Sequence, residues 1–319
     1  MKLALRVVAV LALLVVVAGG VFYFNPLWVG DQQTRLRLWR KGVRSDYVMV
    51  DGYRIHYFEA LPPKGASGTP LLLVHGLGAR AEDWGAMIPA LAAQGFHVYA
   101  PDLLGYGRSA RPDVSYSISM QETWVVEFMR VMHVARADVG GWSMGGWVSM
   151  KLALDHPEMV DRLMVYDSAG IYFPATFGPE LFTPSDVAGV RKLMQILTPK
   201  PMSLPEFVAK AVLRRLEKNA WVLNRSTASM LRGRDLLDFK LHNLRQPMLI
   251  VWGAQDELIP LASGEAMHES VPQSVLAIVD GCGHLAPAEC ARPVLESTVE
   301  FLKAEPPMNG GKMMFPAGR

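Results

Sequence analysis

The sequence has 319 residues, of which 50% are hydrophobic and 19% charged, and its net charge is +2. This length allows one large α/β domain with an insertion or two small domains, and the apolar content suffices for a core. The near-neutral charge, with no long basic run and no RNA-binding signature, excludes a dedicated nucleic-acid-binding protein.

The N-terminal segment is long and apolar. Residues 7–24 carry no charge and follow Lys2 and Arg6, and at about 1.5 Å per residue a helix of this length nearly crosses a bilayer core. The apolar run is longer than that of a signal peptide, and Tyr23 and Trp28 suit an interfacial belt. Residues 1–30 are therefore predicted to be a retained membrane anchor, with a signal peptide as the alternative. The flanking charges leave the side of the membrane open, and we favour the extracytoplasmic side.

Residues 46–170 alternate predicted strands with predicted helices. Residues 47–60 alternate polar and apolar around Asp51-Gly52, which predicts a β-hairpin. The continuous apolar run at residues 71–74 is typical of a strand buried on both faces of a parallel sheet. Such alternation indicates a mostly parallel sheet flanked by helices. The other elements expected are helices at 82–93, 117–133 and 146–155, and strands at 97–100, 137–140 and 160–166.

The alternation of strands and helices stops at Ile171. Residues 171–243 offer only helical patterns, and a strand at 247–253 then resumes the sheet. Both ends of the helical block return to the same core, so we predict a helical cap inserted between two strands of a core made of residues 46–170 and 244–304. The Pro-, Gly- and Met-rich residues 305–319 are predicted to be a disordered tail.

The stretch Gly141-Trp142-Ser143-Met144-Gly145 is a G-x-S-x-G pattern between a predicted strand and a predicted helix. That context is the one required by a nucleophile elbow, in which a strained turn exposes the serine hydroxyl above the sheet. We predict that Ser143 is a catalytic nucleophile.

A serine nucleophile needs a histidine base, which a carboxylate orients. In strand–turn–helix hydrolases the order along the chain is serine, acid, histidine. His284 follows the last core strand and is the predicted base, whereas His268 lies within a helix. Asp256 follows the strand at 247–253 and is the predicted acid. Asp167, at the end of the preceding strand, is the alternative.

The oxyanion formed during such a reaction needs backbone N–H donors. The amide of Met144, at the start of a helix, is one predicted donor, and the amide of Leu77 is the other. His75 precedes the nucleophile and is expected to brace the oxyanion turn. Cys282 and Cys290 match no metal-ligand spacing, and we expect neither a metal nor a cofactor. The two cysteines are expected to be buried thiols, with a disulfide as the alternative if the chain is exported.

Residues 46–303 resemble the α/β-hydrolase family. The resemblance rests on five ordered motifs: His75-Gly76-Leu77-Gly78, Pro101-Asp102-Leu103-Leu104-Gly105-Tyr106-Gly107-Arg108-Ser109, the elbow with Gly146, Trp252-Gly253-Ala254-Gln255-Asp256 and Gly281-Cys282-Gly283-His284. It implies an α/β-hydrolase fold with an eight-stranded sheet. The membrane segment, Ser143-Met144-Gly145-Gly146, Asp167-Ser168-Ala169-Gly170 and the Gly-Cys-Gly-His loop most resemble membrane-anchored monoacylglycerol lipases and related bacterial lipases.

This resemblance implies a serine hydrolase that cleaves carboxylic esters of lipids, with no obligate protein partner evident. Epoxide hydrolases and haloalkane dehalogenases carry an aspartate at the elbow instead of Ser143, and carbon–carbon bond hydrolases usually carry a tryptophan in place of Leu285. The alternatives left open are a small-ester esterase or perhydrolase, a carbon–carbon bond hydrolase and a catalytically silent binding scaffold. The predicted cap holds eleven Lys and Arg against six Asp and Glu, which indicates a solvated basic face or, beside a membrane anchor, a face that holds the cap against anionic lipid.

Overall fold

The computed structural model describes residues 2–200 and 203–316. One nine-stranded sheet forms its centre, in the order β1-β2-β4-β3-β5-β6-β7-β8-β9. The strands are β1 (Arg44–Val50), β2 (Tyr53–Ala60), β3 (Thr69–Val74), β4 (Phe96–Pro101), β5 (Ala137–Trp142), β6 (Val160–Tyr166), β7 (Met248–Gly253), β8 (Val275–Val279) and β9 (Lys312–Phe315).

The pairing of the strands is mostly parallel. The hairpin β1–β2 and the pair β2–β4 are antiparallel, and every pair from β4–β3 onward is parallel. The hairpin turns at Asp51 and Gly52, both with positive φ, as predicted. All residues of β5 and β7 are buried, as expected for strands covered on both faces. The predicted α/β architecture with a mostly parallel sheet is therefore confirmed.

The sheet has nine strands rather than the predicted eight because the C-terminal segment adds β9. The prediction of a disordered tail over residues 305–319 is wrong for Lys312–Phe315, which pairs parallel to β8. Backbone bonds from Leu276 N–H to the Gly311 carbonyl and from Asp280 N–H to the Phe315 carbonyl, of 3.0 and 2.9 Å, hold this edge strand. Pairing with an existing strand thus overrides the turn-rich composition of the tail. Residues 317–319 of that predicted tail lie outside the described residues.

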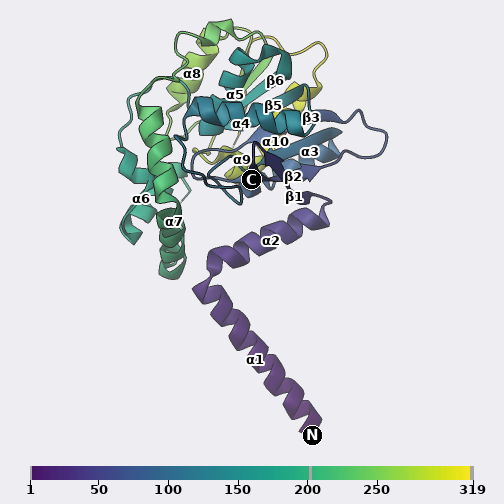
Figure 1. Cartoon of the computed structure of the whole chain (residues 1–319), viewed down its shortest axis with the longest axis vertical. Coiled ribbons are helices and arrows are strands. Elements are labelled where there is room, and N and C mark those ends of the chain that lie inside the picture. The colour runs from purple at the N-terminus through teal and green to yellow at the C-terminus, as the bar shows by residue number, and fades with distance from the viewer. Residues whose placement is uncertain (1, 201–202, 317–319) are drawn as a thin grey trace.

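Helices cover both faces of the sheet (Figure 1). Side chains of three helices, Val125, Trp147 and Met267 among them, join one hydrophobic cluster. Met87 and Phe301 belong to a second cluster on the other face. The helices that contribute to the first cluster are α4 (Ile118–Val131), α5 (Met144–Asp155) and α8 (Leu261–Ser270). Those that contribute to the second cluster are α3 (Met87–Ala93) and α10 (Ala291–Lys303).

The N-terminal segment forms two helices. Helix α1 (Lys2–Phe24) projects away from the rest of the molecule, and its residues 4–24 have a mean hydropathy of 2.8 with none of them buried. Helix α2 (Pro26–Arg40) follows at an angle (Figure 1) and buries Leu38 against the core. Pro26 begins this helix, because a proline is tolerated in the first helical turn but ends a preceding helix. The predicted anchor boundary at residue 30 therefore falls inside α2.

We call residues 171–243 the helical insertion. It lies between β6 and β7 and contains a 3-10 helix (Pro179–Phe182), α6 (Val187–Leu197), α7 (Glu206–Leu231) and a second 3-10 helix (Leu241–Asn243). Its described residues, 171–200 and 203–243, form no strand. At the start of α7, the ring of Phe207 stacks on that of Tyr23 from α1, with ring centroids 5.2 Å apart. The insertion thus contacts the N-terminal helix as well as the core.

Candidate active site

Ser143 lies in the sharp turn between β5 and α5. Its φ is +56°, a left-handed value that is unusual for a residue with a side chain. The flanking glycines are needed because the backbones approach closely: a Cβ on Gly145 would lie 2.2 Å from the Val74 carbonyl oxygen, and one on Gly141 would lie 2.2 Å from the Gly145 carbonyl oxygen. The turn thus holds the Ser143 side chain beyond the end of the sheet, the geometry that the sequence predicts for an elbow.

The structure brings Ser143, His284 and Asp256 together. His284 Nε2 lies 2.9 Å from Ser143 Oγ, and His284 Nδ1 lies 2.8 Å from Asp256 Oδ2. His284 follows β8, and Asp256 follows β7. Both are buried, with exposures of 3% and 6%, whereas Ser143 is half-buried. These distances lie within hydrogen-bond range and match the order nucleophile, base and orienting carboxylate.

The Asp256 carboxylate has two further hydrogen bonds besides the one to His284. The backbone amides of Leu258 and Ile259 donate to its Oδ1 at 2.8 and 2.9 Å. Asp167, the alternative acid, instead accepts a bond from the Gly253 amide and has no hydrogen bond to His284 among those of the described residues. The geometry therefore selects Asp256 over Asp167 as the histidine's carboxylate partner.

The two predicted oxyanion donors flank the nucleophile. Met144 is the first residue of α5, directly after Ser143. The turn that precedes Leu77 lies against the nucleophile, since a Cβ on Gly76 would come within 2.9 Å of the Ser143 Cβ. In the described part of the chain, the backbone N–H groups of Leu77 and Met144 have no hydrogen-bond acceptor. Both amides are thus free to donate to a ligand oxygen beside Ser143.

His75 braces the turn that carries Leu77. Its Nδ1 donates to the Gly76 carbonyl at 2.9 Å, and its Nε2 accepts from the Leu103 amide at 2.9 Å. Burial lowers the pKa of His75 below its usual range, so the ring is neutral and takes this one tautomer. The structure gives His75 the bracing contacts that the sequence predicts, and it makes none to the Ser143 side chain among those described.

Tyr106 links the core to the helical insertion beside the site, and the sequence did not predict this. Its hydroxyl lies 2.6 Å from Ser226 Oγ on α7 and 4.0 Å from the sulfur of Met144. Tyr106 belongs to the turn-rich loop after β4, a motif whose glycines point to a tight turn but not to an α7 contact.

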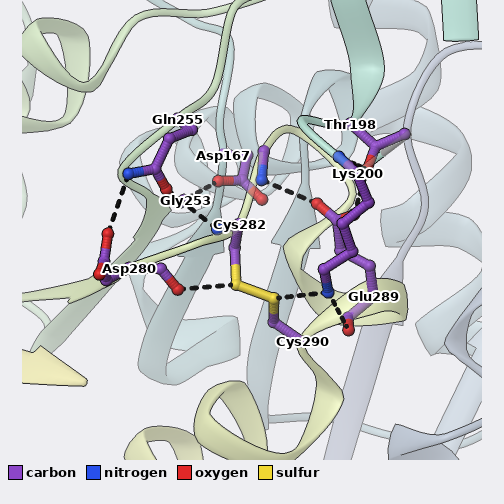
Figure 2. The surroundings of a disulfide bond; sticks show 10 residues. Asp167, Thr198, Lys200, Gly253, Gln255, Asp280, Cys282, Glu289 and Cys290 are labelled. Carbon is purple, nitrogen blue, oxygen red and sulfur yellow. Dashed lines mark hydrogen bonds between the residues drawn. A yellow bond between two sulfur atoms is a disulfide. The ribbon is translucent and has the colours of Figure 1, made fainter. Parts of the chain in front are cut away.

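Cys282 and Cys290 form a disulfide across the loop that bears His284 (Figure 2). Their Cα atoms are 6.3 Å apart, within the range of ordinary disulfides. The expectation of two separate thiols is therefore wrong, because the turn into helix α9 (Ala286–Glu289) brings the two side chains together.

Glu289 ties the same loop to the helical insertion, a role that its sequence position does not reveal. Its carboxylate accepts from the Gly283 amide at 2.7 Å and from the hydroxyl of Thr198, a residue of the insertion (Figure 2). Lys200 donates to the Glu289 carbonyl at 3.1 Å. The residue before His284 is thus fixed from the insertion side.

Within residues 2–200 and 203–316, no cluster of three or more histidine, cysteine or acidic side chains is arranged to hold a metal ion. A cavity of about 400 Å³ lies between residues 113–115 and α7. Ser143 and His284 do not line this cavity, so it is separate from the candidate site.

A family model described as the alpha/beta hydrolase fold matches residues 69–289. The chain is 28% identical to Lipase 1 of Psychrobacter immobilis over 254 residues, covering 75% of this chain and 77% of that protein. It is equally identical, 28% over 254 residues, to a 2-hydroxymuconate semialdehyde hydrolase of a Pseudomonas species, covering 74% of this chain and 87% of that protein.

Among solved structures, the chain is similar to a bacterial membrane phospholipase A described as a virulence factor. The TM-score is 0.79 and the sequence identity 26%, and the match covers 95% of this chain and 98% of that one. Because so little of the chain is left out, the match must include part of the N-terminal helices α1 and α2.

Proposed function

The chain belongs to the α/β-hydrolase family, and from this premise we propose that it is a serine hydrolase that cleaves carboxylic esters of lipids. The observation that carries the proposal is the hydrogen-bonded series Ser143, His284 and Asp256, with distances of 2.9 and 2.8 Å. Such a series converts a weakly nucleophilic hydroxyl into an effective one at neutral pH.

In the proposed reaction, His284 Nε2 takes the proton of Ser143 as the Oγ attacks the ester carbonyl. The carbonyl oxygen gains negative charge, and the amides of Leu77 and Met144 donate to it. His284 then gives its proton to the leaving alcohol, and an acyl-enzyme remains. A water molecule, deprotonated by His284, releases the fatty acid and restores the serine. Asp256 keeps Nδ1 of His284 protonated and stabilises the imidazolium in both steps.

A lipid substrate is supported by three observations. The relatives include a lipase, and the chain is similar in fold to a membrane phospholipase A over 95% of its length. The exposed apolar helix α1 is long enough to cross a membrane. We therefore propose that α1 is a retained anchor, that the helical insertion acts as a cap over the site, and that the ester partitions into the bilayer. We further propose that this cap leaves room for one acyl chain, which would favour monoacylglycerols as substrates.

The disulfide bears on the side of the membrane. Disulfides persist in oxidising compartments and are rare in the cytosol. The Cys282–Cys290 bond therefore supports an extracytoplasmic catalytic domain.

The second candidate function is carbon–carbon bond hydrolysis, which the 2-hydroxymuconate semialdehyde hydrolase relative favours. The identity of 28% to this relative equals that to the lipase, so sequence similarity does not separate the two. The apolar N-terminal helix favours the lipid ester, because an enzyme that acts on a substrate dissolved in water gains nothing from a membrane anchor.

The test is a series of monoacylglycerols and nitrophenyl esters of increasing acyl length, with phospholipids, triacylglycerols and a 2-hydroxymuconate semialdehyde added, on full-length protein in detergent. Each methylene buried in an acyl pocket contributes about 0.8 kcal/mol. We expect kcat/KM to rise to a medium or long acyl optimum, with triacylglycerols poorer. An optimum at acetate excludes the lipase and leaves a small-ester esterase, and preferred cleavage of the semialdehyde identifies a carbon–carbon hydrolase.

A further inference from the structure

A second buried carboxyl, Asp167, lies beside the proposed catalytic acid. It follows β6, its φ is +43°, and its side chain has no exposure to solvent. Its Oδ1 accepts a hydrogen bond of 2.7 Å from the backbone amide of Gly253, the last residue of β7 (Figure 2). Gly253 opens the turn that carries Asp256, since the Asp256 amide donates to the Gly253 carbonyl at 3.2 Å. Asp167 thus fixes the first residue of this turn.

The hydrogen bonds of the two carboxyls are unequal. Asp256 receives three donors, the amides of Leu258 and Ile259 and the ring of His284. Asp167 receives one, and its Oδ2 is buried without a hydrogen-bond partner in the described part of the chain. Two carboxylates that share a buried site cannot both ionise cheaply, and the one with more donors keeps the charge. The unequal hydrogen bonding therefore favours the protonated form of Asp167.

The charged groups around Asp167 also favour its protonated form. Asp256 faces it from the turn after β7, and Glu289 faces it from α9. None of the ion pairs among the described residues includes Asp167, and its hydrogen-bond partner on β7 is the backbone amide of Gly253. The amide of Ala286 points toward the carboxyl without meeting hydrogen-bond geometry. Burial, followed by the charge of Asp256, raises the pKa of Asp167 well above its usual range.

We propose that Asp167 is a neutral positioning residue, which fixes the turn that carries Asp256 without placing a second negative charge beside the Asp256–His284 pair. The inference rests on the proposed serine hydrolase. Its chemical consequence concerns His284. A second carboxylate at this site would stabilise the imidazolium, and the ring would remain protonated at pH values where a base is required.

The experiment compares Asp167→Asn with Asp167→Ala in the full-length enzyme and follows kcat, KM and the pH profile of nitrophenyl ester hydrolysis. Asparagine keeps the acceptor for Gly253 and is uncharged, as a protonated aspartate is. We expect Asp167→Asn to keep kcat/KM within about threefold of the wild type. We expect its acidic limb to shift by less than about half a pKa unit. Alanine removes the acceptor, and we expect kcat to fall about 10- to 100-fold with KM little changed.

Two results would overturn the proposal. If Asp167→Asn lowers kcat/KM by orders of magnitude, or moves the acidic limb down by a full unit or more, Asp167 is ionised. If Asp167→Ala has the wild-type kinetics, Asp167 positions nothing. Where the alanine variant fails to fold, the asparagine variant still decides the charge. Failure of the proposed function has a different signature, because Ser143→Ala and Asp256→Asn would then keep wild-type rates whatever Asp167 does.

Discussion

The indole Nε1 of Trp142 donates a hydrogen bond of 2.8 Å to the backbone carbonyl of His284. Trp142 is the last residue of β5 and immediately precedes Ser143, while His284 lies 142 residues further along the chain. The two are buried, with exposures of 5% and 3%. Trp142, the residue before the proposed nucleophile, therefore holds the backbone of the proposed base in place. We expect the distance between Ser143 Oγ and His284 Nε2 to depend on this bond.

Trp142→Phe tests this relationship. Phenylalanine retains most of the packing but leaves the buried carbonyl of His284 without a donor, which costs about 1–3 kcal/mol of unfolding free energy. We expect that loss in denaturant titrations, together with a fall in kcat that exceeds the change in KM. A variant with wild-type kcat would show that the bond does not position His284.

Ser143→Ala and His284→Ala should each lower ester hydrolysis by about four to six orders of magnitude without loss of fold. The two residues act as one unit, so the double variant should be little slower than either single one. Steady-state rates with circular dichroism as the folding control provide the measurement. Additive losses, or fluorophosphonate labelling that persists in Ser143→Ala, would contradict the assignment.

Asp256→Asn should fold normally and lower kcat by about four orders of magnitude, because an amide stabilises the wrong histidine tautomer and does not support the imidazolium. Glu257→Gln, one residue further along, is the matched control and should keep the wild-type rate. Equal losses in the two variants would point to a general effect on the turn rather than to a role of Asp256 in the reaction.

The variant Cys282→Ser/Cys290→Ser removes the closed loop around His284. For a loop of this length, the unfolding free energy should fall by about 2–3 kcal/mol. Dithiothreitol should lower the melting temperature of the wild type to that of the variant and leave the variant itself unchanged. Equal melting temperatures of the two proteins before reduction would mean that the disulfide does not stabilise the fold.

Stability should also depend on pH through Asp138 in β5. Burial, followed by the charge of Asp161, raises the pKa of Asp138 to about 7. The folded state then binds a proton that the unfolded state releases near pH 3.8, so this group makes stability fall as pH rises from about 4 to 7. Asp138→Asn removes this dependence. Its advantage over the wild type should grow by at most about 1.4 kcal/mol per pH unit and level off above pH 7. Parallel stability curves would refute the shift.

Local patterns made the elbow and its partners predictable. The glycines around Ser143 report a close backbone approach, and Asp256 and His284 each follow an apolar strand. Parallel strands place such residues along one edge of the sheet. The hydrogen bonds there connect the same serine, histidine and aspartate that their order along the chain predicts.

Features that depend on contacts between distant segments were not predictable. Strand β9 exists through its pairing with β8, and Glu289 joins the His284 loop to Thr198 across 91 positions of the chain. The disulfide likewise requires the three-dimensional approach of two cysteines. Helix α2 was missed because the basic residues around Arg37 look like a membrane-flanking segment rather than part of the core.

The stacking of Phe207 on Tyr23 joins the helical insertion to the end of the apolar helix. For an enzyme anchored through α1, this contact keeps the insertion near the membrane surface from which substrate arrives. The substrate concentration that such an enzyme experiences is the amount of ester per area of membrane. The rate then follows the mole fraction of ester in the membrane rather than its amount per volume. Diluting a fixed quantity of ester with an inert lipid slows such an enzyme although the bulk concentration has not changed.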